Sequence, residues 1–120
     1  MPVVVGMDVA TATGIALGEP GAKPLCWTEV LGERGSPHQV RFDQAIRVTS
    51  RLIANHDPVL IAIERPIMVP KRDNLAKLEL LYGLVGCIRG VASNRGVATM
   101  IVNIGKMDSH FLGVGKMKSA

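Results

Sequence analysis

The sequence has few aromatic residues and few cysteines, and each shortage excludes a class of protein. Only 3% of the 120 residues are aromatic, too few to build the stacking platform on which proteins bind the bases of single-stranded nucleic acids. The two cysteines, Cys26 and Cys87, lie far apart and lack a Cys-x-x-Cys spacing, so neither a disulfide framework nor a zinc site is indicated. We expect both to be thiols packed in the core.

Long hydrophobic runs are also missing. No stretch of about 18 uncharged apolar residues occurs, and the N-terminus lacks the basic region of a signal peptide. We therefore expect a soluble protein that is not secreted and does not contact membranes, with the cytoplasm as its compartment. Because 48% of the residues are hydrophobic, the chain can bury a core, and its length predicts a single domain over residues 1–120.

The chain carries an excess of positive charge, with a formal net charge of +4 and a pI near 9.4. Such a balance favours a polyanionic partner. The last sixteen residues hold Lys106, Lys116 and Lys118 against one acid, Asp108, so we expect a local basic surface. With so few aromatic residues, contact with a phosphate backbone is the expected mode of binding.

Two apolar runs each end in a carboxylate. Residues 3–7 read Val-Val-Val-Gly-Met and precede Asp8, whereas residues 59–63 read Val-Leu-Ile-Ala-Ile and precede Glu64. Both runs are typical of buried strands, where a charge is costly unless it is paired or holds a metal. Since ligands collect at the carboxyl ends of strands in α/β sheets, the sequence predicts one shared acidic site.

Each carboxylate also has a purely structural alternative. Asp8 could hydrogen-bond the turn residues Thr11 and Thr13, as Asp commonly does, and Glu64 could pair with Arg65. The segment that follows, 65–72, holds two prolines and ends in Lys71 and Arg72. We expect it to form a stiff basic loop that faces the substrate.

The remaining pattern predicts the element order β-β-β-α-β-α-β. Strands are expected over residues 3–7, 15–17, 25–31, 59–64 and 96–103, and the second helix over 75–94, capped by Asp73 or Asn74. The first helix should begin at a capping box of Ser36 with Pro37 and Gln39 and end before Asp57-Pro58. Its expected apolar stripe leaves Arg41 and Arg47 outside it; the stripe consists of Phe42, Ala45, Ile46, Thr49, Leu52 and Ile53.

Three glycines fall on one side of the second helix: Gly83, Gly86 and Gly90. Each costs a helix about 1 kcal/mol relative to alanine, which indicates a close approach of another backbone. We interpret this first as packing on the sheet, and as a helix–helix dimer contact in the alternative.

Three motifs together resemble one known family. They are Gly-Met-Asp-Val-Ala-Thr-Ala-Thr-Gly-Ile-Ala at 6–16, Ile-Ala-Ile-Glu-Arg-Pro at 61–66, and Gly105-Lys106 followed by Phe-Leu-Gly-Val-Gly-Lys-Met-Lys at 111–118. In this order they are similar to RuvC-type Holliday junction resolvases, particularly the short phage-type members. The resemblance spans essentially the whole chain.

The resemblance implies a fold and an activity. It implies a ribonuclease H-like α/β fold with a mixed five-stranded sheet and helices packed on it, and a homodimer that cuts four-way (Holliday) DNA junctions in recombination and repair. It also implies a host that is a bacterial cell or a phage-infected cell. On this basis Asp8 and Glu64 are the expected catalytic metal ligands, and the expected DNA-binding residues are Lys71, Arg72, Lys106, Lys116 and Lys118.

The chemistry of phosphodiester hydrolysis fits these residues. Two metal ions about 4 Å apart can activate the attacking water and stabilise the leaving oxygen, and hard carboxylate oxygens select Mg²⁺, with Mn²⁺ as a substitute. We expect Asp8 to bridge two such ions and Glu64 to hold one of them.

One feature of the family is missing. Resolvases of this type have further aspartates on a C-terminal helix after the Gly-Lys loop, whereas this chain ends at Ala120, so we expect the domain to be truncated there and this form to be inactive if nothing replaces them. The alternatives are a related nuclease that acts on structured RNA, and a junction-binding or dimerisation module without catalysis. The Thr-Gly turn also resembles the phosphate-binding hairpin of actin-like ATPases, but such an ATPase needs a much longer chain.

Overall fold

The computed structural model describes residues 2–64 and 74–102, which form five strands and two helices. The elements are β1 (Val4–Asp8), β2 (Ala12–Gly18), β3 (Leu25–Val30), α1 (His38–His56), β4 (Leu60–Glu64), α2 (Leu75–Asn94) and β5 (Ala98–Val102). This order and the element types confirm the prediction from the sequence, with strand ends shifted by one to three residues. No described helix is long and apolar enough to cross a membrane.

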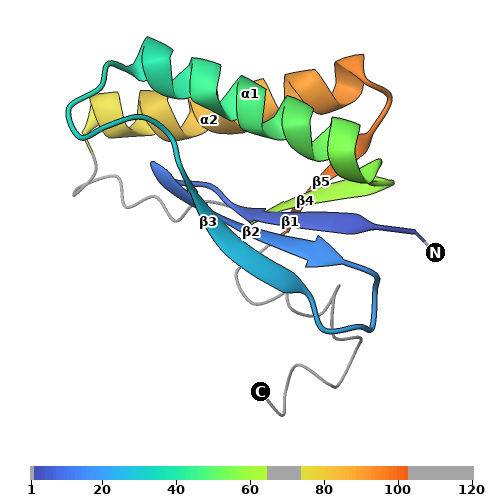
Figure 1. The fold of residues 1–120 in the computed structure, drawn as a ribbon. Helices are drawn as coiled ribbons and strands as arrows, with labels where there is room; N and C mark the ends of the chain where they lie inside the picture. Colours follow the sequence, from blue (N-terminus) through green and yellow to red (C-terminus); the bar gives the residue numbers. More distant parts are fainter. Residues whose placement is uncertain (1, 65–73, 103–120) are drawn as a thin grey trace.

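The strands form one mixed sheet in the order β3-β2-β1-β4-β5. β1, β2 and β3 pair antiparallel as a meander, whereas β4 pairs parallel with β1 and β5 pairs parallel with β4. Both helices lie side by side on the same face of the sheet (Figure 1). Because each helix connects parallel strands, α1 and α2 run parallel to each other and begin at the carboxyl edge of the sheet.

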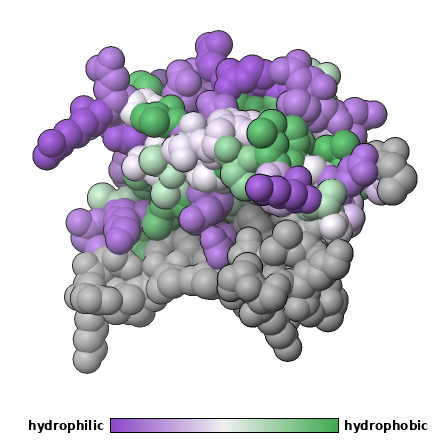
Figure 2. Space-filling model, turned by 60° about the horizontal axis from the view of Figure 1, so that its bottom comes forward, coloured by the Kyte–Doolittle hydropathy of each residue, from purple (hydrophilic) through white to green (hydrophobic). Residues whose placement is uncertain are grey.

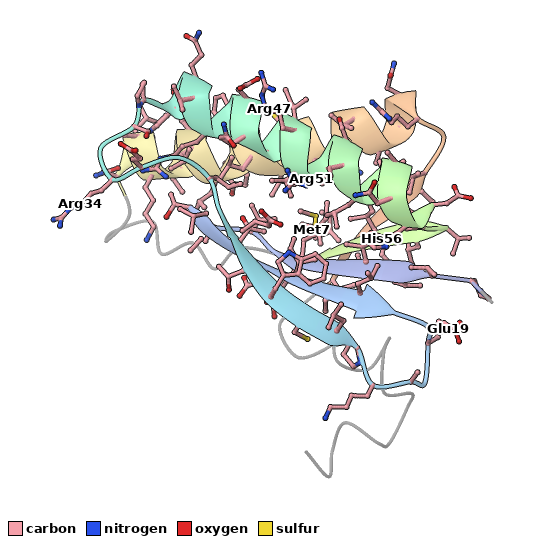
Figure 3. The ribbon with its side chains drawn as sticks, in the orientation of Figure 1. Met7, Glu19, Arg34, Arg47, Arg51 and His56 are labelled. Atoms are coloured by element: carbon pink, nitrogen blue, oxygen red, sulfur yellow. The ribbon has the colours of Figure 1, made fainter. Side chains whose placement is uncertain are left out.

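The core lies between this face and the helices. Alternate strand residues point into it because successive side chains of a strand point to opposite faces. Met7, which Figure 3 labels, lies between sheet and helical layer and is 1% exposed. The other fully buried members from strands and helices include Val5, Ile15, Ile61, Ile63, Leu84 and Ile88. Each such side chain contributes about 1.5–3 kcal/mol.

The two helices begin differently, and only one start was predicted correctly. Asn74 caps α2, its side chain accepting a hydrogen bond of 2.8 Å from the Lys77 N–H. The capping box expected for α1 is wrong: Pro37 is the N-cap and no side chain caps the helix. The Ser36 hydroxyl donates instead to the Glu33 carbonyl oxygen at 2.6 Å, so the preceding loop uses it.

The buried stripe of α1 also differs in part from the expected one. Ile46 is 41% exposed, whereas Val48, which lay outside the expected stripe, is 4% exposed. The helix ends as expected, with Asp57 in the left-handed conformation donating its N–H to the Ile53 carbonyl. The buried stripe is rotated because α1 packs against both the sheet and α2. The helical repeat of the sequence does not indicate the contact with α2.

The three glycines of α2 do not pack on the sheet. A Cβ at Gly83 would lie 2.5 Å from Cε1 of Phe42 on α1, whereas Gly86 and Gly90 have open space around that position. The first interpretation, packing of all three on the sheet, is therefore wrong, and the alternative of a helix–helix dimer contact stays a prediction. Gly83 is needed for a helix–side chain contact, and the other two face outward.

One of the two cysteines occupies an unexpected place. Cys26 lies exposed on the edge strand β3, which contradicts the expected packed thiol. Cys87 is partly buried in α2 against the core, and burial raises the pKa of its thiol. Because β3 lies at the edge of the sheet, the side chains on one of its faces are poorly covered. The sequence of β3 does not reveal that it is an edge strand.

Thr49 in α1 gives a stability prediction. It is 0% exposed, and its hydroxyl has no hydrogen-bond partner among the described residues. A buried unsatisfied hydroxyl costs about 1–3 kcal/mol, so Thr49→Val should raise the free energy of unfolding by about 1 kcal/mol or more. Urea unfolding followed by circular dichroism measures it. Thr49→Ser, which keeps the hydroxyl and loses a methyl group, should lower stability; a destabilised Thr49→Val would contradict the assignment.

Candidate functional site

The sheet brings the two predicted carboxylates together. Asp8 is the last residue of β1 and Glu64 the last of β4, and the two are direct partners in the parallel pairing of these strands. Neighbouring strands lie about 4.8 Å apart, and paired residues point to the same face. The prediction that these residues meet at the carboxyl edge of one sheet is therefore confirmed in position.

Both carboxylates lie on the face opposite the helices. Met7 and Ile63 belong to the core under the helices, so Asp8 and Glu64, one residue further along each strand, point to the other face. Asp8 is exposed and Glu64 half-buried. Figure 2 brings this side forward: hydrophilic residues gather along the top of the view, at the helical layer, and the described part below is paler and more apolar.

The strand next to Asp8 leaves space beside it. Gly14 of β2 is the antiparallel partner of Asp8, and a Cβ at Gly14 would lie 3.6 Å from the Asp8 Cβ. A side chain at this position would fill the room beside the carboxylate. Asp8 is thus flanked by a glycine on one side and an acid on the other, an arrangement that leaves its oxygens accessible to a ligand.

The alternative role for Asp8 as a turn cap is not supported. Thr13 is 1% exposed, and its hydroxyl is occupied by Ala10: it donates to the Ala10 carbonyl at 2.6 Å and accepts from the Ala10 N–H at 3.3 Å. Within residues 2–64 and 74–102, no hydrogen bond or ion pair of the Asp8 carboxylate is found. The alternative for Glu64 involves Arg65, which lies outside the described residues.

The described part of the chain brings two carboxylates together at this edge of the sheet. Among those residues no group of three or more His, Cys, Asp or Glu side chains is placed to hold a metal ion. Two adjacent carboxylates fit Mg²⁺, which keeps several waters and is often bound through one or two carboxylates together with substrate phosphates. The donor set is therefore compatible with Mg²⁺ and unlike a zinc site.

The remaining predicted site residues lie outside the described residues; they are Lys71, Arg72, Lys106, Lys116 and Lys118. The distribution of charge along the chain nevertheless bears on them. The described residues hold eight basic and eight acidic side chains and are neutral, whereas segments 65–73 and 103–120 each hold three basic residues and one acid. The net charge of +4 thus resides in the two segments that directly follow the carboxyl ends of β4 and β5.

The helices add to the positive character of this edge. α1 and α2 both begin there, with Pro37 and Asn74 as their N-caps. Helix N-termini carry a partial positive charge and unpaired N–H groups, which favour anions. In Figure 3, Arg34 projects outward from the β3–α1 connection at this end, whereas Glu19 marks the opposite end of the sheet.

Arg41 was missed by the analysis of the sequence, which placed it only outside the apolar stripe. Its guanidinium donates to the backbone carbonyls of Leu31 at 2.8 Å and Glu33 at 3.1 Å, near the carboxyl edge. No local pattern marks such a residue, because its partners are backbone atoms of a neighbouring loop.

Comparisons with known proteins agree with the fold. No protein-family model matches the sequence, and no curated protein matches it. Among solved structures, RuvC of T. thermophilus in complex with a Holliday junction substrate has a TM-score of 0.73 at 15% identity, covering 98% of this chain and 82% of that one. A second T. thermophilus RuvC structure has a TM-score of 0.68 at 15% identity, covering 96% and 74%.

The yeast mitochondrial Holliday junction resolvase Ydc2 is also similar, with a TM-score of 0.62 at 14% identity over 97% of this chain and 59% of that chain. The chain has the ribonuclease H-like fold of the RuvC-type resolvases, as the motifs predicted.

Proposed function

We propose that this protein is a structure-selective, Mg²⁺-dependent endonuclease that cuts phosphodiester bonds in four-way DNA junctions. The observation that carries the proposal is the direct pairing of Asp8 with Glu64 at the carboxyl ends of neighbouring parallel strands, in a sheet with the RuvC fold. The similar T. thermophilus structure contains a Holliday junction substrate.

Asp8 and Glu64 are the proposed metal ligands. Asp8, exposed on the central strand β1, would contact two Mg²⁺ or Mn²⁺ ions, and Glu64 on β4 would hold one of them. Bound ions of this kind supply an activated water and stabilise the leaving oxygen. The two carboxylates would hold the cations against which the scissile phosphate binds, and Gly14 leaves room beside Asp8.

The proposed DNA contacts are phosphate contacts. The excess of four positive charges lies in the two segments that start at this edge, and α1 and α2 point their N-termini to it. Lys71, Arg72, Lys106, Lys116 and Lys118 are the proposed contributors. Since these contacts are electrostatic, junction binding should weaken steeply as salt is raised.

We further propose a homodimer that uses the outer surface of the helices. Val40, Ile46 and Tyr82 are 40%, 41% and 62% exposed on α1 and α2. Ile46 lines a groove with Gly86 and Gly90, and nothing lies within 4 Å of the Cβ position of either glycine. A two-fold dimer would present two copies of the acidic site, matching the two strands that must be cut in a four-way junction.

A cleavage assay on three substrates tests the proposed function. The full-length protein is incubated with an end-labelled four-way junction, a linear duplex of the same sequence and a structured RNA, in Mg²⁺, Mn²⁺ or EDTA. We expect paired nicks near the branch point of the junction in either metal, none in EDTA and none on the duplex. Cutting of the RNA alone would establish the RNA nuclease, and tight junction binding without nicks would establish the binding module.

A further inference from the structure

The turn that follows Asp8 is held by one buried threonine. Thr13 lies at the start of β2 with 1% of its surface exposed, and its hydroxyl both donates to the Ala10 carbonyl at 2.6 Å and accepts from the Ala10 N–H at 3.3 Å. Both polar groups of the Ala10 backbone are therefore tied to one side chain. Asp8 is the last paired residue of β1, and only the buried Val9 separates it from this clamp.

The same turn is held from the opposite side by a chain of hydrogen bonds that starts on α1. The Arg41 guanidinium donates to the Leu31 carbonyl at 2.8 Å, and the Leu31 N–H donates to the Thr11 carbonyl at 2.8 Å. Leu31 is 1% exposed, so this peptide unit is excluded from water. The chain connects the helical layer to the residue next to Ala10.

Arg41 serves this loop rather than a carboxylate. Its second contact, 3.1 Å to the Glu33 carbonyl, closes the loop that the Ser36 N–H and hydroxyl also hold through the same oxygen. Within the described residues Arg41 forms no ion pair, unlike Arg47 and Arg51, which pair with Asp43 and Glu29. A guanidinium bound to two backbone carbonyls positions those carbonyls, because its N–H groups form a rigid planar fork.

We propose that Thr13 and Arg41 are positioning residues for Asp8: they fix the turn at residues 10 and 11 from its two sides and thereby set the direction of the Asp8 carboxylate. The inference rests on the proposed function, in that Asp8 must hold a metal ion for its direction to matter. Groups that orient metal ligands typically change metal affinity or activity by about 10–100-fold when they are removed. Displacement of a reacting group by about 1 Å has an effect of the same order.

Two variants remove the clamps without adding bulk. Thr13→Val keeps the shape of the side chain and removes the hydroxyl, and Arg41→Met keeps much of the stem and removes both N–H contacts. Thr13→Ser retains the hydroxyl and serves as the rescue variant. Arg47→Met is the matched control, since Arg47 lies on the same helix with its side chain 68% exposed and paired only with Asp43.

Two readouts separate positioning from folding. In the full chain, the Mn²⁺ concentration that half-broadens the Asp8 amide signal in NMR spectra reports metal binding at Asp8 without requiring cleavage. The kcat and KM for junction cleavage report the reaction. For Thr13→Val and Arg41→Met we expect the Mn²⁺ midpoint to rise and kcat to fall by about 10–100-fold, with KM unchanged, while Thr13→Ser and Arg47→Met behave as wild type.

The outcomes distinguish this inference from the proposed function. If wild-type protein binds Mn²⁺ at Asp8 and both clamp variants bind it equally well, Thr13 and Arg41 only stabilise the fold and the inference is wrong. If wild-type protein binds no Mn²⁺ at Asp8, both the proposed metal site and this inference are wrong. If Thr13→Val unfolds, Arg41→Met decides by the same midpoint, with thermal melts confirming that it is folded.

Discussion

Replacing Asp8 by asparagine should lower junction cleavage by more than about a hundredfold, the upper range seen when only a supporting group of a metal site is lost, while junction binding is retained. Asp8 stands on the central strand between Gly14 and Glu64. Asparagine keeps the size of the side chain and removes the charge that a divalent ion requires. Losing one negative charge also reduces repulsion of the DNA phosphates, so binding should not weaken.

The measurement is single-turnover cleavage of a labelled junction, with binding measured by gel shift in Ca²⁺. Glu64→Gln should act in the same direction. Asp43→Asn is the matched control, because Asp43 is an exposed acid that pairs with Arg47. It lies on α1, which covers the face of the sheet opposite the two carboxylates. If Asp8→Asn cleaves as fast as Asp43→Asn, the assignment of the metal site is wrong.

Replacing Gly83 by alanine should destabilise the fold by about 1–3 kcal/mol, as over-packing of a core does. The new Cβ would lie 2.5 Å from Cε1 of Phe42, and the Phe42 ring packs against the core, so the ring has to move out of a filled space. The gain in helix propensity, about 1 kcal/mol, offsets only part of this. Thermal and urea unfolding measure the loss.

Gly86→Ala is the matched control on the same helix. Nothing lies within 4 Å of the Cβ position at Gly86, so the substitution should stabilise the monomer by up to about 1 kcal/mol. If a second copy packs in the groove lined by Ile46, Gly86 and Gly90, the same substitution should weaken dimerisation, which sedimentation at several concentrations measures. A stable dimer in Gly86→Ala would place the dimer interface elsewhere, and a stable Gly83→Ala would contradict the α1–α2 packing.

Much of the fold could be predicted because its signals are local. Runs such as residues 59–63 are apolar throughout and rich in β-branched residues, which favours a strand buried on both faces. The α1 and α2 segments have helical spacing, and Asn74 and Asp57 mark a beginning and an end. The pairing of Asp8 with Glu64 could also be predicted, because acids at the ends of two neighbouring parallel strands lie at the same edge of the sheet.

The failures concern contacts and exposure that the periodicity of the sequence does not encode. Ser36 has the spacing of a capping residue, yet its hydroxyl serves the Glu33 carbonyl. Cys26 sits in an apolar run, yet β3 is an edge strand and leaves it exposed. A local pattern indicates which structure a residue favours, whereas these outcomes depend on which groups surround the residue in the folded chain.

The sequence by itself thus determined the order and type of the elements and the two acids at the strand ends, because hydrophobic periodicity and turn chemistry act over a few residues. Only the tertiary structure decided how Asp8 is held. It placed Gly14 beside the carboxylate, occupied the Thr13 hydroxyl with Ala10, and connected Arg41 through Leu31 to Thr11. Apart from the Thr13–Ala10 hydrogen bond, which lies within one turn, these are contacts between separate segments, which exist only once the sheet and its helical layer have assembled.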